Sequence, residues 1–272
     1  MRIQHNINAL NSLRQLGTNN TNTGKNLEKL SSGFRINRAG DDAAGLAISE
    51  KMRAQINGLE MASKNAEDGI SLIQTAEGGL NETHAILQRM RELSVQAANG
   101  TNQDEDLDSI QAEIDALAEE IDRIADSTKF NGISLLNGDI ESTGVTFQIG
   151  SGSKDFESVT LTISAMKASD LGVDSLDVKT DAKAAIDSLD TAIADVSSAR
   201  ANLGAMQNRL EHTINNLGVT SENLTAAESR IRDVDMAKEM MSYTKNNILT
   251  QAAQAMLAQA NQQPQGVLQL LQ

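Results

Sequence analysis

Cysteine and tryptophan are absent from this chain of 272 residues, which has one tyrosine and one proline. Without cysteine, neither a disulfide nor thiolate chemistry is available. Aromatic residues make up only 2% of the chain, so the large anchors of an ordinary globular core are nearly missing. Leucine, isoleucine, alanine and methionine must therefore do the packing. Because proline interrupts helices, the single Pro264 leaves almost every segment free to be helical.

Positive charge is also scarce, and the formal net charge is −14. This acidic balance argues against nucleic acid as a partner, because phosphate binding needs clustered lysine and arginine. No apolar run approaches the ~20 residues of a membrane-spanning helix, so we expect no membrane span. Residues 1–16 lack the continuous apolar region of a Sec-type signal peptide. If the protein is exported, another route carries it.

The two ends of the chain differ in charge from its middle. Residues 246–272 contain no charged side chain, and 11 of them are asparagine or glutamine. Residues 1–30 carry four basic residues against a single acid, Glu28, so the acidic excess lies between the ends. In a polymer with the chain termini inside, the acidic middle segments of neighbouring copies would lie at the solvent-exposed surface. Salt screens the repulsion between them there within ~10 Å at 0.1 M. This layout predicts that the ends pack where other copies of the chain come close.

The strongest periodicity is a seven-residue repeat of apolar residues, which predicts long helices with a coiled-coil seam. In the C-terminal half the repeat comprises Leu189, Val196, Leu203, Leu210, Leu217, Leu224 and Ile231. Upstream it comprises Met52, Leu59, Ala66, Ile73, Leu80 and Leu87. A third segment alternates steps of three and four through Leu107, Ile110, Ile114, Leu117, Ile121 and Ile124. Residues 43–231 are thus predicted to form a rod-like bundle of three amphipathic helices, with a break at Asn99-Gly100.

Between these helical segments the apolar period changes to two. Val145, Phe147 and Ile149 alternate with polar residues, and so do Val159, Leu161 and Ile163. The intervening Gly150-Ser151-Gly152-Ser153 stretch indicates a hairpin loop. The predicted fold class is mainly α: an elongated antiparallel helical bundle or coiled coil built from both chain halves, with a small β-hairpin near residues 140–165. There is too little chain between the halves for a large variable outer domain.

The terminal segments, residues 1–42 and 232–272, are weaker helix formers. Each has a narrow apolar stripe and a low helix propensity, so order in isolation is marginal. We expect both to be disordered in the monomer and to fold on assembly. The residues to which we assign polymerisation contacts are Ile3, Ile7, Leu10, Ile248, Ala252, Met256, Leu257, Leu268, Leu270 and Leu271. Met240-Met241 could line a soft binding groove, but we interpret them as core filler.

Groups that could carry chemistry have simpler interpretations. The acids from Asp104 to Asp115 resemble half of a calcium loop, but the helical period from Leu107 denies the loop shape, and acids favour a helix N-terminus. Asp41-Asp42 is interpreted as a helix N-cap instead of a catalytic pair. We find no metal-binding, nucleotide-binding or catalytic motif, so we predict a protein without enzymatic activity or cofactor. Gly69 lies inside a predicted helix, where glycine costs ~1 kcal/mol, and a close helix approach would explain it.

Several motifs of the chain resemble those of bacterial flagellin. Residues 30–48, LSSGFRINRAGDDAAGLAI, are similar to the N-terminal signature of that family, with Phe34 where leucine is usual. Further similar blocks are NAEDG at 65–69, QRMREL at 88–93, FNG at 130–132, NRL at 208–210, IRDVDMA at 231–237 and MLAQAN at 256–261. The resemblance covers nearly the whole chain.

This resemblance implies a structural subunit that self-assembles into the extracellular flagellar filament used for motility. Export would proceed through the flagellar type III channel, with an export chaperone, cap and junction proteins as partners. The terminal helices would form the inner core of the filament. A surface presented to Toll-like receptor 5 would include Gln88, Arg89, Leu93 and Glu113, and the terminal leucines would be recognised by inflammasome receptors. In place of the basic residue often found last in the family, this chain has Gln272.

Two alternatives remain open at this point. A hook-filament junction protein shares similar termini but usually has a larger middle. A cytosolic methyl-accepting signalling protein shares long heptad helices but needs a helical hairpin tip, whereas a β-hairpin is predicted here.

Overall fold

The computed structural model describes the backbone of residues 6–270 and the side chains of residues 6–262. The chain divides into two compact units. We call residues 1–54 and 223–272 the terminal unit, and residues 55–222 the bundle unit. The helices are α1 (Ile7–Ser32), α2 (Ala43–Ala97), α3 (Asp104–Ser127), α4 (Val178–Arg232) and α5 (Met236–Leu270). The division falls inside α2 and α4. The first residues of α2 and the last residues of α4 contact the chain around Phe34, through Arg53 and Arg232, and do not belong to the bundle core.

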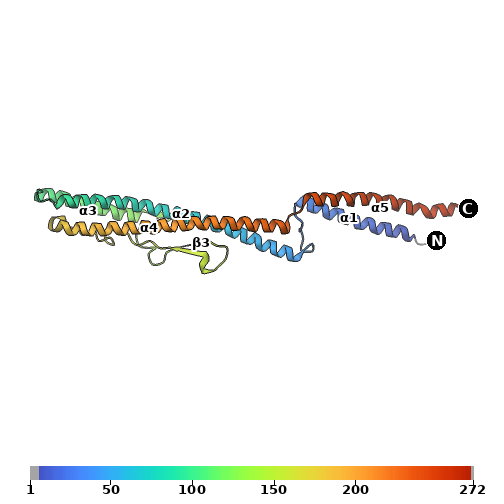
Figure 1. Ribbon diagram of the computed structural model, residues 1–272, viewed down its shortest axis with the longest axis horizontal. Helices are drawn as coiled ribbons and strands as arrows, with labels where there is room; N and C mark the ends of the chain where they lie inside the picture. The colour runs from blue at the N-terminus through green and yellow to red at the C-terminus, as the bar shows by residue number, and fades with distance from the viewer. Residues whose placement is uncertain (1–5, 271–272) are drawn as a thin grey trace. The chain divides into compact units, whose positions relative to one another are not determined.

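In the bundle unit, α2, α3 and α4 lie side by side (Figure 1). Ion pairs between Arg91 and Asp190 at 2.6 Å and between Arg200 and Glu77 at 3.6 Å show that α2 and α4 run antiparallel. The mainly helical antiparallel bundle predicted from the heptads is thereby confirmed. Of the predicted seam, the structure buries Leu59, Ile73, Leu80, Leu87, Ile114, Ile121, Leu189, Val196, Leu203, Leu210 and Leu217. It leaves Met52, Leu117, Leu224 and Ile231 half-buried.

The segment between α3 and α4 contains two short antiparallel ladders. The first pairs β1 (Lys129–Phe130) with β2 (Ile133–Ser134), and the second pairs β3 (Val145–Gln148) with β4 (Ser158–Leu161). In the second, Val145 lies opposite Leu161 and Phe147 opposite Val159, which is the hairpin that the alternating pattern predicts. The connection between β3 and β4 includes the short 3-10 helix η1 (Asp155–Glu157).

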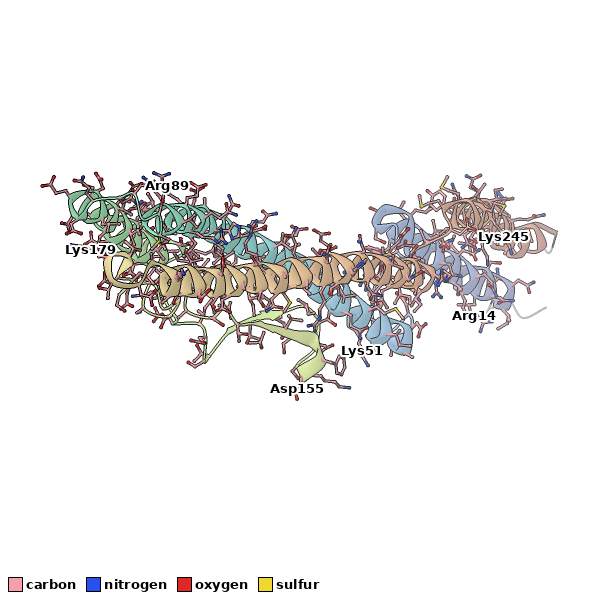
Figure 2. All side chains as sticks on the ribbon, turned by 60° about the vertical axis from the view of Figure 1, so that its left-hand side comes forward. Arg14, Lys51, Arg89, Asp155, Lys179 and Lys245 are labelled. Carbon is pink, nitrogen blue, oxygen red and sulfur yellow. The ribbon has the colours of Figure 1, made fainter. Side chains whose placement is uncertain are left out.

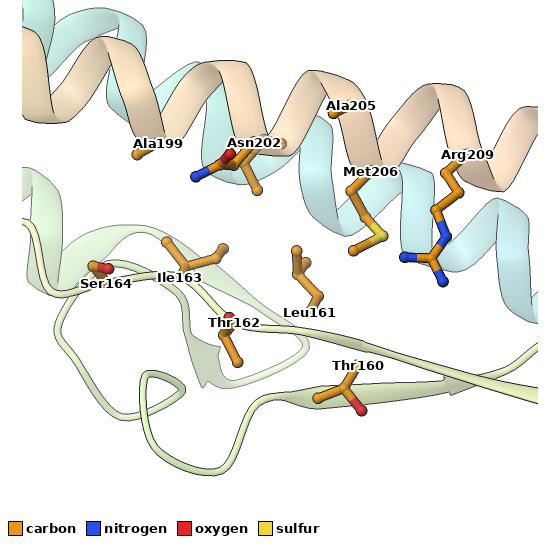
Figure 3. Close-up of a pocket in the computed structure, with 11 residues that line it drawn as sticks. Thr160, Leu161, Thr162, Ile163, Ser164, Ala199, Asn202, Ala205, Met206 and Arg209 are labelled. Atoms are coloured by element: carbon orange, nitrogen blue, oxygen red, sulfur yellow. The ribbon is translucent and has the colours of Figure 1, made fainter. Parts of the chain in front are cut away.

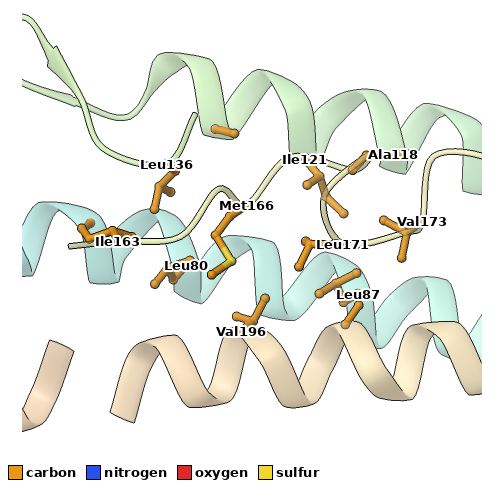
Figure 4. Packing of buried hydrophobic residues seen from close by; sticks show 14 of the residues in the cluster. Leu80, Leu87, Ala118, Ile121, Leu136, Ile163, Met166, Leu171, Val173 and Val196 are labelled. Carbon is orange, nitrogen blue, oxygen red and sulfur yellow. The ribbon is translucent and has the colours of Figure 1, made fainter. Parts of the chain in front are cut away.

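This connecting segment also completes the core of the bundle unit, a role that the periodicity did not reveal. Leu136, Ile163, Met166 and Val173 pack among α2, α3 and α4 (Figure 4). Leu135 and Leu136 are fully buried. Their spacing follows neither a helical nor a strand period, because irregular backbone presents each side chain by its own local turn. The three helices are therefore closed by a non-helical fourth layer.

Glycines in α2 allow that layer to come close to the helix. A Cβ atom built on Gly69 would lie 3.2 Å from Leu210 and 3.4 Å from Phe147. A Cβ on Gly79 would lie 2.8 Å from the hydroxyl of Thr128. The close approach expected at Gly69 is thus present, and it involves both α4 and the hairpin.

In the terminal unit, α1 packs along α5 (Figure 1). Where the sequence predicts disorder for a single chain, both segments are helical, because each gives the other a partner for one face. No residue of α1 is fully buried, however. The pairing therefore removes little apolar surface from water, and most of the free energy that could stabilise these helices is not gained within the unit.

A candidate self-association surface on the terminal helices

The seam between α1 and α5 is built mainly from small and polar residues, together with Leu16, Leu30, Tyr243 and Leu257. The half-buried positions of α1 recur at helical spacing through Ala9, Ser12, Leu16, Asn19, Thr23, Asn26 and Leu30. Those of α5 recur through Glu239, Tyr243, Asn246, Thr250, Ala253 and Leu257, and end at the buried Ala260. At one end of this seam the side-chain amide of Asn6 donates to the carbonyl oxygen of Ala260 at 2.7 Å.

Most of the large apolar side chains of both helices are exposed and lie outside this seam. The outer apolar surface, as we call it, consists of Ile7, Leu10, Leu13 and Leu27 of α1 and Met236, Met240, Met241, Ile248, Leu249 and Met256 of α5. These side chains are 40–68% exposed. Four of them, Met240, Met241, Ile248 and Leu249, line an open hollow of about 530 Å³ on α5. Soluble monomers rarely expose large contiguous apolar patches, so a surface of this kind indicates an interface.

The predicted tail residues fall into three groups. Ile7, Leu10, Ile248 and Met256 belong to the outer apolar surface, and Ala252 is exposed beside them. Leu257 is half-buried, because it faces α1 in the seam. Ile3 and Leu271 lie outside the described residues, and Leu268 and Leu270 lie in α5 with side chains beyond the described ones.

Sequence reasoning missed part of this surface. Leu13 follows Leu10 by three residues, and that spacing could have identified it. Met240 and Met241 were interpreted as core filler, and this is wrong, because their side chains are 49% and 68% exposed. The adjacent pair points two ways from the helix, so one helical partner cannot cover both.

A short junction holds the two terminal helices at their shared end. The backbone N–H of Arg35 donates to the carbonyl of Arg232 at 2.7 Å, and that of Val234 donates to the carbonyl of Gly33 at 3.0 Å. The guanidinium of Arg232 lies 4.8 Å from the ring centroid of Phe34 and pairs with Glu50 at 2.6 Å. Gly33, at φ +74°, ends α1 in the left-handed conformation that glycine adopts without strain. The junction therefore fixes which faces of α1 and α5 meet.

The acidic groups considered for chemistry have structural partners. Asp42 accepts a hydrogen bond from the backbone N–H of Gly45 at 2.9 Å, as an N-cap of α2 does. Asp41 accepts from the N–H groups of Arg38 and Asn37, and these bonds lower the pKa of its carboxyl group. Asp104, Glu105 and Asp106 occupy the first turn of α3, which is helical where a calcium loop would be irregular. Among the described side chains, those of residues 6–262, no group of three potential metal ligands comes together.

The predicted receptor surface is only partly on the outside of the bundle unit. Gln88 and Arg89 of α2 and Glu113 of α3 are exposed, and Figure 2 labels Arg89 on the surface. The Arg89 guanidinium pairs with Glu113 at 2.8 Å. This hydrogen bond raises the pKa of Arg89. Leu93 does not belong to the exposed surface, because its side chain packs in the core and is 2% exposed.

Among residues 6–270, no helix is sufficiently long and apolar to cross a membrane. Sequence comparison matches residues 3–141 to the bacterial flagellin N-terminal helical region and residues 186–271 to the bacterial flagellin C-terminal helical region.

Full-length relatives and a solved structure agree with these matches. A flagellin of Bacillus subtilis (strain 168) is 60% identical, with 100% of both chains covered. The flagellar filament 33 kDa core protein of Treponema phagedenis is 52% identical, also over 100% of both chains. The crystal structure of Bacillus cereus flagellin is 36% identical at a TM-score of 0.50 and covers 61% of this chain and 94% of that one. The chain belongs to the bacterial flagellin family.

Proposed function

We propose that this protein is the structural subunit of an extracellular flagellar filament, and that the outer apolar surface of α1 and α5 carries the contacts between copies. Support comes from one observation above all: most of the large apolar side chains of the terminal helices are exposed and lie outside the seam between α1 and α5. Each Leu, Ile or Met side chain that becomes buried on assembly contributes roughly 1.5–3 kcal/mol. Several such residues per copy outweigh the cost of holding two weakly formed helices in place.

Charge supports the placement of these helices inside the filament. Residues 246–272 carry no charged side chain, whereas the chain as a whole carries a formal net charge of −14. Copies that meet through α1 and α5 therefore bring together uncharged or mildly basic surfaces, and their acidic segments stay where salt can screen the repulsion. Residues 1–42 and 232–272 form the inner core in this proposal, and the bundle of residues 43–231 surrounds it.

Point variants on the outer apolar surface test the proposal. Leu10→Asp and Ile248→Asp are expected to abolish sedimentable filaments, because each places a charge in a buried contact. Both positions are exposed in the single chain, so the thermal unfolding of the monomer should change little. Leu10→Met keeps an apolar side chain and should polymerise. Filaments of normal length from either aspartate variant would contradict the proposed contacts.

The remaining partners are part of the same proposal and are those expected of the family. We assign export through the flagellar type III channel and interactions with an export chaperone, the filament cap and junction proteins. A role as a hook-filament junction protein has no comparable support. The number of copies of the protein in one flagellum separates the two roles, because a filament subunit is needed in thousands and a junction protein in a handful.

Host recognition is proposed for two places. Gln88, Arg89 and Glu113 offer an exposed polar surface to Toll-like receptor 5, and the terminal Leu268, Leu270 and Leu271 offer a site to inflammasome receptors. Arg89→Ala is the informative change for the first surface, since Arg89 is exposed and its loss leaves the core intact. It should weaken binding of the monomer to the receptor ectodomain, and Glu92→Ala, which keeps the Arg89–Glu113 pair, is the control. Leu93→Ala cannot serve, because it would leave a cavity in the core.

A further inference from the structure

The loop between β3 and β4 presents a single aromatic side chain to solvent. Phe156 is 75% exposed, more than any other large apolar residue whose side chain is described. It lies beside Asp155, which Figure 2 labels at the outer tip of the hairpin. The Lys154 ammonium lies 5.6 Å from the centroid of its ring. We call residues 154–156 the knob.

Hydrogen bonds within the loop hold the knob in place. The side-chain amide of Gln148 donates to the carbonyl oxygens of Gly150 and Gly152, at 3.1 and 2.7 Å. The carboxylate of Glu157 accepts from the backbone N–H of Lys154 at 3.1 Å, and the N–H of Ile149 donates to the carbonyl of Glu157 at 2.8 Å. A Cβ on Gly150 would lie 2.6 Å from that of Glu157, so the loop closes only with glycine there. Phe156 is therefore displayed by an ordered support.

A matching concave surface lies elsewhere in the bundle unit. The first hollow, of about 320 Å³, lies between residues 160–164 and one face of α4. Met206 points into it from α4, the buried Leu161 and Ile163 form its floor, and Arg209 lies at one end (Figure 3). This volume is at the lower end of the roughly 300–1,000 Å³ typical of small-ligand pockets, and it is large enough for one aromatic side chain.

A second hollow of about 440 Å³ continues the first one, and both are lined by Ser164, Ala199 and Asn202. Its lining contains three acids, Glu141, Asp170 and Asp195, and no basic residue. The two hollows together therefore run from the cationic Arg209 to an acidic end. The knob carries the complementary charges, with the Lys154 ammonium beside the aromatic ring and the Asp155 carboxylate next to it.

The knob of one chain cannot enter the hollow of the same chain in this structure. The loop is seated at Gly58 of α2, where a Cβ would lie 2.8 Å from that of Ser151. The first hollow lies along residues 199–209 of α4, which contacts α2 through Arg200 to Glu77 and through Leu210 near Gly69. From Gly58 to Gly69 is at least about 16 Å along the helix. A knob that enters the hollow must therefore come from another molecule.

We infer that the knob of one subunit inserts into the hollows of a neighbouring subunit in the filament, with Phe156 against Met206 and Ala199 at the mouth and Lys154 toward the acidic end. The inference rests on the proposed filament function and adds a contact through the bundle unit. A knob and a hollow at different places on one chain make a head-to-tail contact, which can repeat along an open helical array. The knob belongs to residues 142–185, between the two family matches, so it lies outside the segments that those matches cover.

Cross-linking tests this contact directly, because the chain contains no cysteine. Asp155→Cys and Asn202→Cys chains, mixed in equal amounts and polymerised, are expected to give a covalent dimer with a short bismaleimide. Both changes keep the aromatic ring and its apolar lining. Unpolymerised mixtures, and a control mixture of Asp155→Cys with Val95→Cys, should give little dimer. Filaments that form but yield no more dimer than the control would overturn the inference and leave the proposed function standing.

A second measurement needs no substitution in the contact. Hydroxyl-radical footprinting of the unmodified chain should show that oxidation of Phe156 and of Met206 falls several-fold on assembly. Unchanged oxidation of Phe156 in filaments would overturn the inference even if a cysteine variant failed to polymerise. If the unmodified chain forms no filaments, this inference and the proposed function are both wrong.

Phe156→Ala measures the strength of the contact. The concentration of chain left unpolymerised at equilibrium should rise about tenfold or more, as expected for losing one buried aromatic side chain. The unfolding temperature of the monomer should not change, because the ring is exposed there. An unchanged concentration of free chain would count against the knob.

Discussion

The guanidinium of Arg232 lies 4.8 Å from the ring centroid of Phe34, although the two residues are 198 positions apart in the sequence. Arg53 approaches the same ring at 6.0 Å. The Arg232 side chain is 13% exposed and also pairs with Glu50. Phe34 follows α1, and Arg232 ends α4 just before α5 begins. This contact therefore holds together the connection that follows α1 and the connection that precedes α5. It sets the register in which α1 and α5 pair.

Loss of the Phe34 ring should loosen the terminal helices selectively. Cation–π contacts contribute about 0.5–2 kcal/mol, and removal of the half-buried ring adds a packing loss. Phe34→Ala is expected to speed amide hydrogen exchange throughout α1 and α5 and to leave the bundle unit unchanged. Phe34→Leu keeps apolar volume without the ring and should show a smaller effect of the same kind. Equal exchange in all three proteins would show that the junction does not hold these helices.

Two adjacent glycines of α2 should respond in opposite directions to the same substitution. Around Gly78 nothing lies within 4 Å of an added Cβ, so Gly78→Ala is expected to stabilise the protein by about 1 kcal/mol through helix propensity alone. An added Cβ at Gly79 would lie 2.8 Å from Thr128 and 2.9 Å from Leu136. Gly79→Ala should therefore be destabilising. Denaturant unfolding measures both free energies, and stabilisation by Gly79→Ala would show that α2 does not need this close approach.

Truncation of the seam leucine Leu210 should be costly. Its side chain is fully buried between α4 and α2, and Leu→Ala changes at such sites cost about 2.7–5 kcal/mol. Leu13→Ala is the matched control, because Leu13 is 54% exposed in the single chain. The control should leave the unfolding free energy of the monomer nearly unchanged and weaken polymerisation. A small loss for Leu210→Ala would mean that the core relaxes around the deleted atoms.

Acid should weaken the ion pair between Arg91 and Asp190. The hydrogen bond from Arg91 lowers the pKa of the Asp190 carboxyl below its ordinary value of 3.8. A lowered pKa in the folded state means that the pair stabilises the protein above pH 3.8 and that this contribution disappears as the pH falls through the folded value. Asp190→Asn should therefore reduce stability at pH 7, and the difference from the unmodified protein should shrink as the pH falls below 3.8. A difference that stays constant with pH would contradict this assignment.

The bundle and hairpin could be predicted because their information is local. Heptads such as Leu189 to Leu217 bury one stripe of a helix, and Val145 to Ile149 alternates as one half-buried strand must. The break at Asn99-Gly100 and the cap at Asp42 depend on turn and helix-end chemistry that a few neighbouring residues specify. Motif similarity supplied the family in the same way, from residues that lie next to one another.

Tertiary structure alone decided which apolar residues face outward. By hydropathy, Leu93 and Met241 could each have been core or surface, yet Leu93 is 2% and Met241 68% exposed. Leu136 and Met166 entered the core on irregular backbone that no period describes. The sequence by itself thus determined the helices, the hairpin and the family, because propensity and periodicity act over short distances. Burial depends on partners distant in sequence, so the outer apolar surface, the knob and the hollows became visible only in the folded chain.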